Sequence, residues 1–453
     1  MDQQCSADRV AVGRPRWLVG MALLLVALAW LPALAAVFQF DDYRVIVGDP
    51  AARSLTVWAD EFGTGLRPLL KLSYLLSWAL GDGAPWAFAV FNLLLHALAS
   101  ALVWRLGERL FALAGVEAEQ RAPAALIAAL LFALHPLQTE AVSYLSGRSS
   151  GLSGLLALAA VAAYDRQLRG GARGWAPAFW LAAMLVKETA AVLPLALLAW
   201  DALARPDDPL RQRMARLWPY PLLLIAVVAW MAGSRYTGFF ATSLETRAPL
   251  DNLLQQLPAL VWLLRGALLL RAPNIDPALP VSGGVDAGAL AAAALLIGLL
   301  ASALAWRRWR WPAFCAAWAL VFLLPTNSLL ARLDLANDRQ LYLPMAALAW
   351  TLGWALAWLI RRQPQAGRAL AALLLATLAT LTALRNLDYR SETALWAATL
   401  EQSPGKARVL SNHGVALWQS GHEAEAASAF RTALALDPAY LPARRNLRRL
   451  TGE

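Results

Sequence analysis

Two adjacent carboxylates, Asp41 and Asp42, lie in the segment Phe40-Asp41-Asp42-Tyr43, directly after the first long apolar stretch of the chain. Neighbouring side chains project in different directions, so the two carboxylates can have different roles. One can remove a proton from a hydroxyl group as a general base, while the other orients an acceptor or accepts a hydrogen bond from it. An Asp-Asp pair also commonly caps a helix or fills a loop. The pair alone therefore leaves a catalytic and a structural interpretation open.

Further charged residues stand at the edges of other apolar stretches. Ionisable residues at or within a membrane are costly, so each is a candidate site residue. The cationic candidates are Arg67, Lys71, Arg148, Lys187, Arg332 and Arg339. Such a set suits a phosphate group, because arginine gives forked hydrogen bonds and lysine a point charge. The candidates for acceptor binding or for support of the site are His96, His135, Glu140, Glu188, Asp334, Asp338 and Tyr342.

Several of these residues also have an ordinary structural interpretation. Asn92 and His96 are four residues apart, hence on one helix face, where an interhelical hydrogen bond is common. Lys187 precedes Glu188 and could form a local ion pair with it; otherwise we expect it to bind the phosphate of a ligand. The chain has four histidines and two distant cysteines. We therefore expect no metal site, no disulfide and no cofactor.

The composition indicates a membrane protein. The chain has 453 residues, of which 59% are hydrophobic and 15% are charged. Soluble domains average about 45–50% apolar and about 25% charged residues. An ordinary soluble enzyme, a disordered chain and a DNA-binding protein are excluded. The net charge of +10 comes mostly from arginine clusters between apolar runs, which is the bias of cytoplasmic loops.

The apolar runs predict an all-α, polytopic helical bundle with about 11 spans. The first run, 17–37, is long enough to span a bilayer, and we favour an uncleaved helix over a signal peptide. The other runs are 86–106, 123–134, 151–164, 175–186, 190–204, 218–233, 253–270, 287–306, 311–324, 341–360 and 369–384. An even number of spans must separate the arginine clusters at 205–216 and 307–310. Run 253–270 is therefore re-entrant or interfacial, or the count of spans differs by two.

Arginine placement also predicts the orientation. The N-terminus and the clusters at 105–121, 166–173, 205–216, 307–310 and 361–368 should be cytoplasmic. Five other segments should face the opposite side, together with the active site and the C-terminus: 38–85, 135–150, 187–188, 234–286 and 325–340. We expect a multi-pass protein of the inner (plasma) membrane.

After residue 386 the composition changes, and we expect a short helical module over 387–453. Residues 407–440 fit one tetratricopeptide repeat of 34 residues. Gly414 permits close helix approach, Phe430 fills the groove, and Pro438 ends the second helix. Residues 387–406 fit the second helix of a degraded repeat. One repeat cannot bury its own faces, so the module should lean on the membrane domain. It serves either as a docking groove for a partner or as a structural cap.

The order of motifs over roughly 17–440 resembles a GT-C glycosyltransferase. The motifs are Phe-Asp-Asp at 40–42, Arg-Pro-Leu at 67–69, Asn-x3-His at 92–96, His-Pro-x-Gln-Thr-Glu-Ala-Val-x-Tyr-x-x-Gly-Arg at 135–148, Lys-Glu-Thr-Ala at 187–190 and Asp-Arg-Gln-Leu-Tyr-Leu-Pro at 338–344. Together with the C-terminal repeat they resemble the transmembrane and tetratricopeptide-repeat O-mannosyltransferases and their bacterial relatives. Animal members of that family carry many repeats, whereas this chain has barely one.

The resemblance implies a catalytic domain over 1–386 that transfers one sugar, with inversion, from a polyprenyl-phosphate sugar to a hydroxyl group. The usual acceptor is Ser or Thr of a protein. Carried over, Asp41 would be the general base and Asp42 an acceptor-site residue. The phosphate would be bound by Arg67, Arg148, Lys187 and Arg339. A glycan or lipid acceptor, a transporter of lipid-linked sugars and a non-catalytic scaffold remain alternatives.

Overall fold

The computed structural model describes residues 16–279, 310–327, 331–332 and 334–452, with a few single positions between 290 and 301. The N-terminal segment before Arg16 lies outside the described residues. So do most of the expected span 287–306 and the basic residues Arg307 and Arg308.

Throughout the described ranges the chain forms helices and no strand, which confirms the all-α fold class. The longer helices of the bundle are α1 (Arg16–Trp30), α4 (Pro85–Leu113), α5 (Ala118–Leu134), α7 (Arg148–Leu168), α8 (Trp175–Val186), α9 (Leu193–Ala204), α11 (Pro219–Ala232), α13 (Pro249–Ala267), α15 (Arg310–Leu323), α16 (Pro344–Arg362) and α17 (Pro364–Asp388). Shorter connecting helices are α2 (Leu55–Glu61), α3 (Pro68–Gly81), α6 (Thr139–Val142), α10 (Leu210–Leu217) and α12 (Tyr236–Thr246).

Two of the described helices, α4 and α17, are long and apolar enough to cross a membrane. The number rises to four if each of two bent pairs is one span. The pairs are α5 with Pro136–Val142, bent by 52°, and α10 with α11, bent by 43°. The chain therefore has helices suited to a membrane, and the count of about 11 spans stays a prediction.

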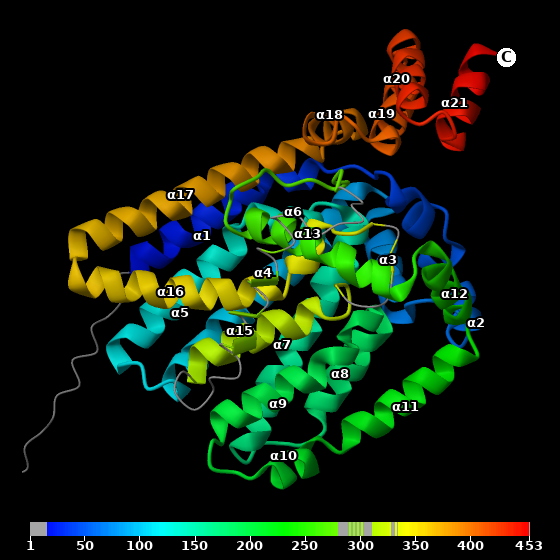
Figure 1. Cartoon of the computed structure of the whole chain (residues 1–453). Helices are drawn as coiled ribbons and strands as arrows, with labels where there is room; N and C mark the ends of the chain where they lie inside the picture. The colour runs from blue at the N-terminus through cyan, green and yellow to red at the C-terminus, as the bar shows by residue number, and fades with distance from the viewer. Residues whose placement is uncertain are drawn as a thin grey trace, which may run out of the picture.

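Small residues let the bundle helices approach closely. Gly353 of α16 faces α5 so closely that a Cβ atom there would lie 2.6 Å from the carbonyl oxygen of Ala124. Gly154 of α7 leaves room for the ring of Tyr342 in the same way, at 2.7 Å. The completely buried rings of Trp180, Trp200 and Trp318 fill the wider gaps. Figure 1 shows α17 running beside α1 along one side of this bundle.

The C-terminal module consists of α18 (Glu392–Gln402), α19 (Ala407–Gln419), α20 (Glu423–Leu436) and α21 (Leu441–Thr451). It lies above the bundle in Figure 1. Helices α19 and α20 pack together where a Cβ on Gly414 would meet the ring of Phe430 at 2.7 Å. The module contacts the rest of the chain, since Lys406 and Arg408 both pair with Asp276. Its identity as a tetratricopeptide repeat stays a prediction.

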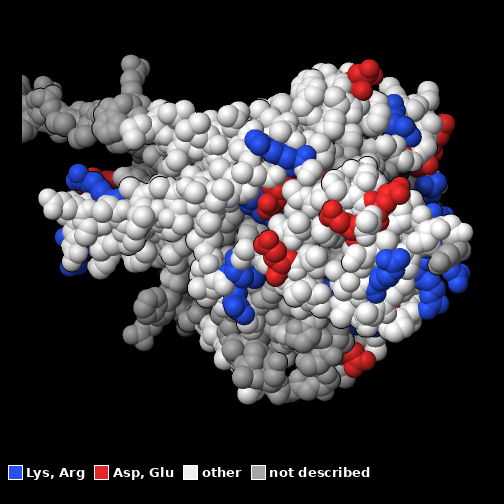
Figure 2. Space-filling model, turned by 90° about the horizontal axis from the view of Figure 1, so that it is seen from above, with Lys and Arg blue, Asp and Glu red and all other residues white. Residues whose placement is uncertain are grey.

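The charged surface differs between the parts of the molecule seen in Figure 2. Seen from above, acidic and basic side chains are intermingled over the main body, whereas the part projecting to the left is largely uncharged except at its tip. A largely uncharged surface is what helices that face lipid require, because charged side chains are costly in the bilayer.

Candidate functional site

A cavity of about 390 Å³ opens where the connecting segments of the bundle meet. Residues from all five segments that the sequence predicts on one side contribute to its wall. The lining residues that bear on the chemistry are Asp41, Arg44, Asp49, Arg67, Lys71, Tyr74, Ser146, Ser149, Lys187, Glu188, Arg235, Tyr236, Arg332 and Arg339. This volume is near the lower end of the range of about 300–1,000 Å³ that is usual for ligand pockets.

The two adjacent carboxylates have different environments. The Asp41 side chain is 36% exposed and lines the cavity, with the Arg44 guanidinium 3.8 Å away. Asp42 is completely buried, and its two oxygens accept hydrogen bonds from the backbone N–H groups of Ser146 at 2.7 Å and Gln39 at 3.0 Å. Burial raises the pKa of Asp42 to about 7, against the opposing effect of these hydrogen bonds. Only Asp41 is placed to meet a substrate directly.

The backbone around Asp41 is held from its other side by Tyr144. The N–H group of Asp41 donates to the Tyr144 hydroxyl at 3.1 Å. Since Asp42 bonds to Ser146, two consecutive residues are fixed to the same 144–146 segment. This arrangement orients the Asp41 carboxylate while leaving it free of a direct hydrogen bond of its own among the described residues.

Cations outnumber carboxylates in the cavity wall, by seven to three. The seven are Arg44, Arg67, Lys71, Lys187, Arg235, Arg332 and Arg339, and the three are Asp41, Asp49 and Glu188. In a partly buried cavity, where charges are screened less than in bulk water, such an excess favours an anionic ligand.

Most of these cations have carboxylate partners. Arg67 makes a forked contact with Glu188 at 2.5 and 3.0 Å. This pairing outweighs the effect of burial and lowers the pKa of Glu188 to about 2. Lys71 contacts Asp49 at 2.9 Å and Glu61 at 3.1 Å. These ion pairs hold the cavity wall in place, and the charges of their members largely cancel.

Lys187 and Arg332 are the exceptions. The Lys187 ammonium donates to the Ser150 hydroxyl at 2.7 Å. The local ion pair with the adjacent Glu188 does not form, because Glu188 pairs with Arg67. In the part of the chain that the structure describes, neither Lys187 nor Arg332 has a carboxylate at ion-pair distance. Burial, followed by the charges of nearby arginines, lowers the pKa of Lys187 well below its usual value. An anion in the cavity would reverse that shift.

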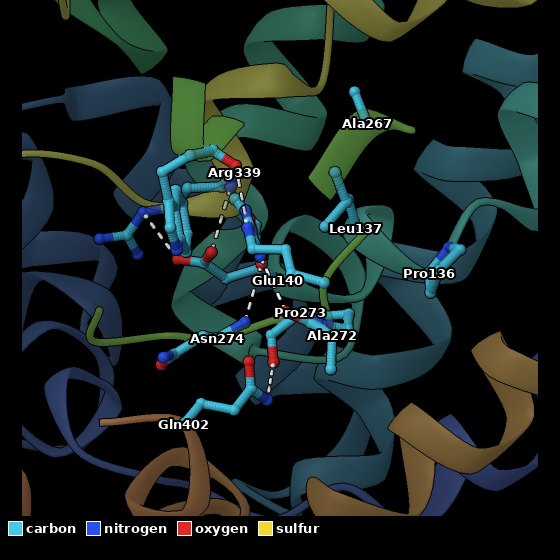
Figure 3. A network of polar contacts seen from close by, with 12 residues as sticks. Pro136, Leu137, Glu140, Ala267, Ala272, Pro273, Asn274, Arg339 and Gln402 are labelled. Carbon is cyan, nitrogen blue, oxygen red and sulfur yellow. Dashed lines mark hydrogen bonds and ion pairs between the residues drawn. The ribbon is translucent and has the colours of Figure 1, made fainter. Parts of the chain in front are cut away.

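Arg339 joins the cavity to a buried network. Its guanidinium Nε lies 3.5 Å from Glu140, and its backbone N–H donates to the same carboxylate at 3.1 Å. Figure 3 shows Glu140 beside Arg339, with Asn274 below them. The neighbouring Asp338 pairs with Arg271 and accepts from the Asn274 N–H at 2.9 Å. Glu140 and Asp338 therefore orient the segment that carries Arg339 without lining the cavity.

Arg148 is not in the cavity, contrary to the expectation that it binds phosphate. It is completely buried, donates to Asn92 at 2.6 Å and to the Ser73 carbonyl at 2.6 Å, and lies over the Tyr74 ring. Arg148 is the first residue of α7, and Asn92 of α4 reaches it there. The acceptors of its hydrogen bonds are all neutral groups. Arg148 consequently fixes the packing of α3, α4 and α7.

The other expected residues also lie outside the main cavity. His96 contacts the Tyr342 hydroxyl at 3.0 Å in the bundle interior, and His135 accepts from the Leu137 N–H beside α13. Asp334 pairs with Arg408 of the C-terminal module. Tyr342 lines a small adjoining crevice of about 50 Å³, which shares Lys187 and Arg339 with the cavity.

Three charged lining residues were not among the expected site residues: Arg44, Asp49 and Arg235. Their only sequence signal is their position in segments 38–85 and 234–286, which is too weak to single them out. No group of three or more His, Cys, Asp or Glu able to hold a metal occurs in the described ranges.

The described residues thus define a helical protein with membrane-suited helices and a cationic cavity into which the half-exposed Asp41 carboxylate opens. Parts of the chain are similar to protein O-mannosyl-transferase Tmtc2 of Drosophila melanogaster, at 33% identity over 204 residues, 40% of this chain and 21% of that protein. Protein O-mannosyl-transferase TMTC1 of Mus musculus is 34% identical over 202 residues, 38% of this chain and 21% of that protein.

A more distant relative, protein O-mannosyl-transferase F38B6.6 of Caenorhabditis elegans, is 28% identical over 159 residues, 31% of this chain. The matched stretches span 21–22% of the length of these three curated relatives. No family model matches the chain, and no solved structure matches it. These similarities confirm the resemblance to the transmembrane and tetratricopeptide-repeat O-mannosyltransferases.

Proposed function

We propose that this protein is a membrane glycosyltransferase that moves a single sugar from a polyprenyl-phosphate sugar to a hydroxyl group, with inversion. The acceptor we propose is Ser or Thr of an envelope protein, in keeping with the names of the similar proteins. The observation that supports this most is that one cavity holds a half-exposed carboxylate, Asp41, together with Lys187 and Arg332, which have no carboxylate partner among the described residues.

In the proposed reaction Asp41 accepts the proton of the acceptor hydroxyl. The hydroxyl oxygen forms a bond to the anomeric carbon of the sugar as the bond from that carbon to the phosphate oxygen breaks. The polyprenyl phosphate leaves with the bonding electron pair. Lys187, Arg332 and Arg339 would stabilise the charge that develops on its oxygens. Asp42 does not react and instead holds the 40–42 turn against Ser146.

We further propose about 11 spans in the inner (plasma) membrane, with the cavity and the C-terminus on the non-cytoplasmic side. Fusions of a topology reporter at Arg308 and Arg445 should then label opposite sides of the membrane. Finding both on the same side would contradict this count.

The function is tested with the purified full-length chain, polyprenyl-phosphate mannose and a threonine-containing peptide. Release of mannose to water is measured in parallel, so that donor cleavage is detected without the peptide. Asp41→Asn keeps the shape of the side chain but removes the proton acceptor, and loss of a general base lowers the rate by about 10²–10⁴-fold. An Asp41→Asn protein of normal thermal stability that retains more than about a tenth of the activity would contradict the assignment.

A further inference from the structure

The general base candidate follows a residue in an unusual backbone conformation. Phe40 has φ = 45°, in the left-handed region. For a bulky residue this conformation is sterically unfavourable and persists only where the surroundings enforce it. The turn that it makes sets the direction in which Asp41 leaves the chain.

The contacts that enforce this conformation come from the C-terminal module. The Phe40 N–H donates to the Glu392 carboxylate at 3.0 Å, across 352 residues of sequence. The Phe40 ring meets the ring of Trp396 edge to face, with centroids 5.3 Å apart. Glu392 and Trp396 both belong to α18 and lie one helical turn apart. One face of this helix therefore contacts both the backbone and the side chain of Phe40.

The residues before Phe40 are attached to the same region. The Val37 N–H and the Gln39 side-chain amide both donate to the Tyr389 carbonyl, at 3.2 and 2.7 Å. Tyr389 lies between α17 and α18. The chain from Val37 to Phe40 is therefore fixed to the start of the module before it enters the cavity at Asp41.

The other end of α18 contacts the segment around Asn274, which is bonded to the neighbour of the cavity residue Arg339. The Asn274 side chain donates to Ser403 at 2.9 Å, and Gln402 donates to the Pro273 carbonyl at 3.3 Å. Figure 3 shows Gln402 directed to the 272–274 segment. The Asn274 N–H in turn bonds to Asp338, next to Arg339. Helix α18 thus connects the segment of Asp41 with that of Arg339.

We propose that α18 is a positioning element of the active site, in which Glu392 and Trp396 hold Phe40 so that Asp41 faces the acceptor hydroxyl. This inference rests on the proposed function. It gives the short C-terminal module a role in turnover that is separate from binding a partner. Glu392 and Trp396 do not touch the substrate in this proposal; they act through Phe40.

The test compares full-length Glu392→Ala, Glu392→Gln and Glu401→Gln, with Asp41→Asn as the reference for loss of the base. Glu401 is a matched control, because it lies exposed on the same helix and has no side-chain partner among the described residues. The assay is mannose transfer from polyprenyl-phosphate mannose, with release of mannose to water in parallel. A displacement of about 1 Å at a reacting group can lower a rate by about 10²-fold.

We expect Glu392→Ala to lower kcat by at least about tenfold with KM for the donor unchanged. Glu392→Gln should restore most of the turnover, because its amide oxygen still accepts the Phe40 N–H. Glu401→Gln should match the wild type. An inactive Asp41→Asn together with a fully active Glu392→Ala would overturn the positioning role and leave the proposed function intact. An active Asp41→Asn would instead overturn the proposed function.

A second pair of variants covers the case in which Glu392→Ala does not fold. Phe40→Gly and Phe40→Ala both remove the ring, but only glycine adopts a positive φ without a steric penalty. We expect Phe40→Gly to have the higher kcat. Equal turnover of the two variants would overturn the proposal that the left-handed turn positions Asp41.

Discussion

The two ends of the bundle use charge in different ways. At the end where the arginine-rich helix α10 lies, at the bottom of Figure 1, the buried carboxylate of Asp201 accepts two hydrogen bonds from Arg216 at 2.7 Å and one from Tyr164 at 2.6 Å. Nearby, Asp165 binds Arg109 and Arg169 at about 3.0 Å. The cations in these contacts all have a carboxylate partner.

At the cavity end the cations exceed the carboxylates, and Lys187 and Arg332 have none as partner among the residues that the structure describes. Removing one member of a satisfied buried pair leaves an uncompensated charge and destabilises the fold. Removing an unpaired cation takes away a charge that only a ligand would compensate. The comparison therefore predicts that mutations at one end change stability and mutations at the other end change ligand binding.

The largest effect is expected for Asp201→Ala. The change leaves Arg216 with Asp208 as its remaining carboxylate partner and the Tyr164 hydroxyl without its buried acceptor. Breaking a buried ion pair costs about 3–5 kcal/mol. Thermal unfolding of the protein in detergent and the yield of folded protein measure the loss. An unchanged unfolding midpoint would contradict the view that this end is held together by its ion pairs.

Lys187→Ala is expected to change donor binding instead. A hydrogen bond to a charged group contributes about 1.5–3 kcal/mol, so KM for polyprenyl-phosphate mannose should rise by about 10–100-fold. Thermal stability and acceptor dependence should stay as in the wild type. Lys187→Arg serves as the control and should restore binding in part, since it keeps the charge but alters the geometry. A lower unfolding midpoint with unchanged KM would assign Lys187 a structural role.

The pH dependence of donor affinity sharpens the same point. The pKa of Lys187 is low in the free protein because of burial and neighbouring arginines, and a bound phosphate would raise it. Between these two pKa values binding takes up a proton, so affinity should fall as the pH rises, by up to about tenfold per pH unit.

Arginine stays protonated throughout this range, so the dependence should be weaker in Lys187→Arg. Burial raises the pKa of Asp42 to about 7. Its titration contributes equally to the pH profiles of the wild type and of Lys187→Arg, so it does not affect their difference. Identical pH profiles for the two proteins would show that Lys187 does not titrate with donor binding.

The smallest effect is expected for an exposed pair at the far tip of α16. Arg361 pairs with Glu117, and their side chains are 53% and 62% exposed. Solvent screens such pairs, which contribute about 0–1 kcal/mol. Arg361→Ala should therefore leave thermal unfolding and transfer nearly unchanged. A loss as large as that of Asp201→Ala would show that pairing alone, irrespective of burial, decides stability.

Much of the fold and part of the site could be predicted from the sequence. Helix periods and apolar runs identify most bundle helices, because burial in a bundle imposes them locally. The five segments selected by arginine placement all contribute to the cavity wall. The pairings within that wall were not predictable: Lys187 and Glu188 are adjacent, yet Glu188 pairs with Arg67, 121 residues away. Adjacent residues diverge around a helix or turn, so sequence proximity says little about contact.

The sequence by itself determined that this is an all-helical protein with apolar helices, and that Asp41 stands at the edge of the first of them. It also determined the resemblance to the O-mannosyltransferases, because the motifs are local runs of residues. Only the tertiary structure decided that Asp42 is buried, that Arg148 holds α3, α4 and α7 together, and that α18 contacts Phe40. These outcomes depend on how helices cross and on which side chains meet between segments distant in the chain, and no local pattern encodes them.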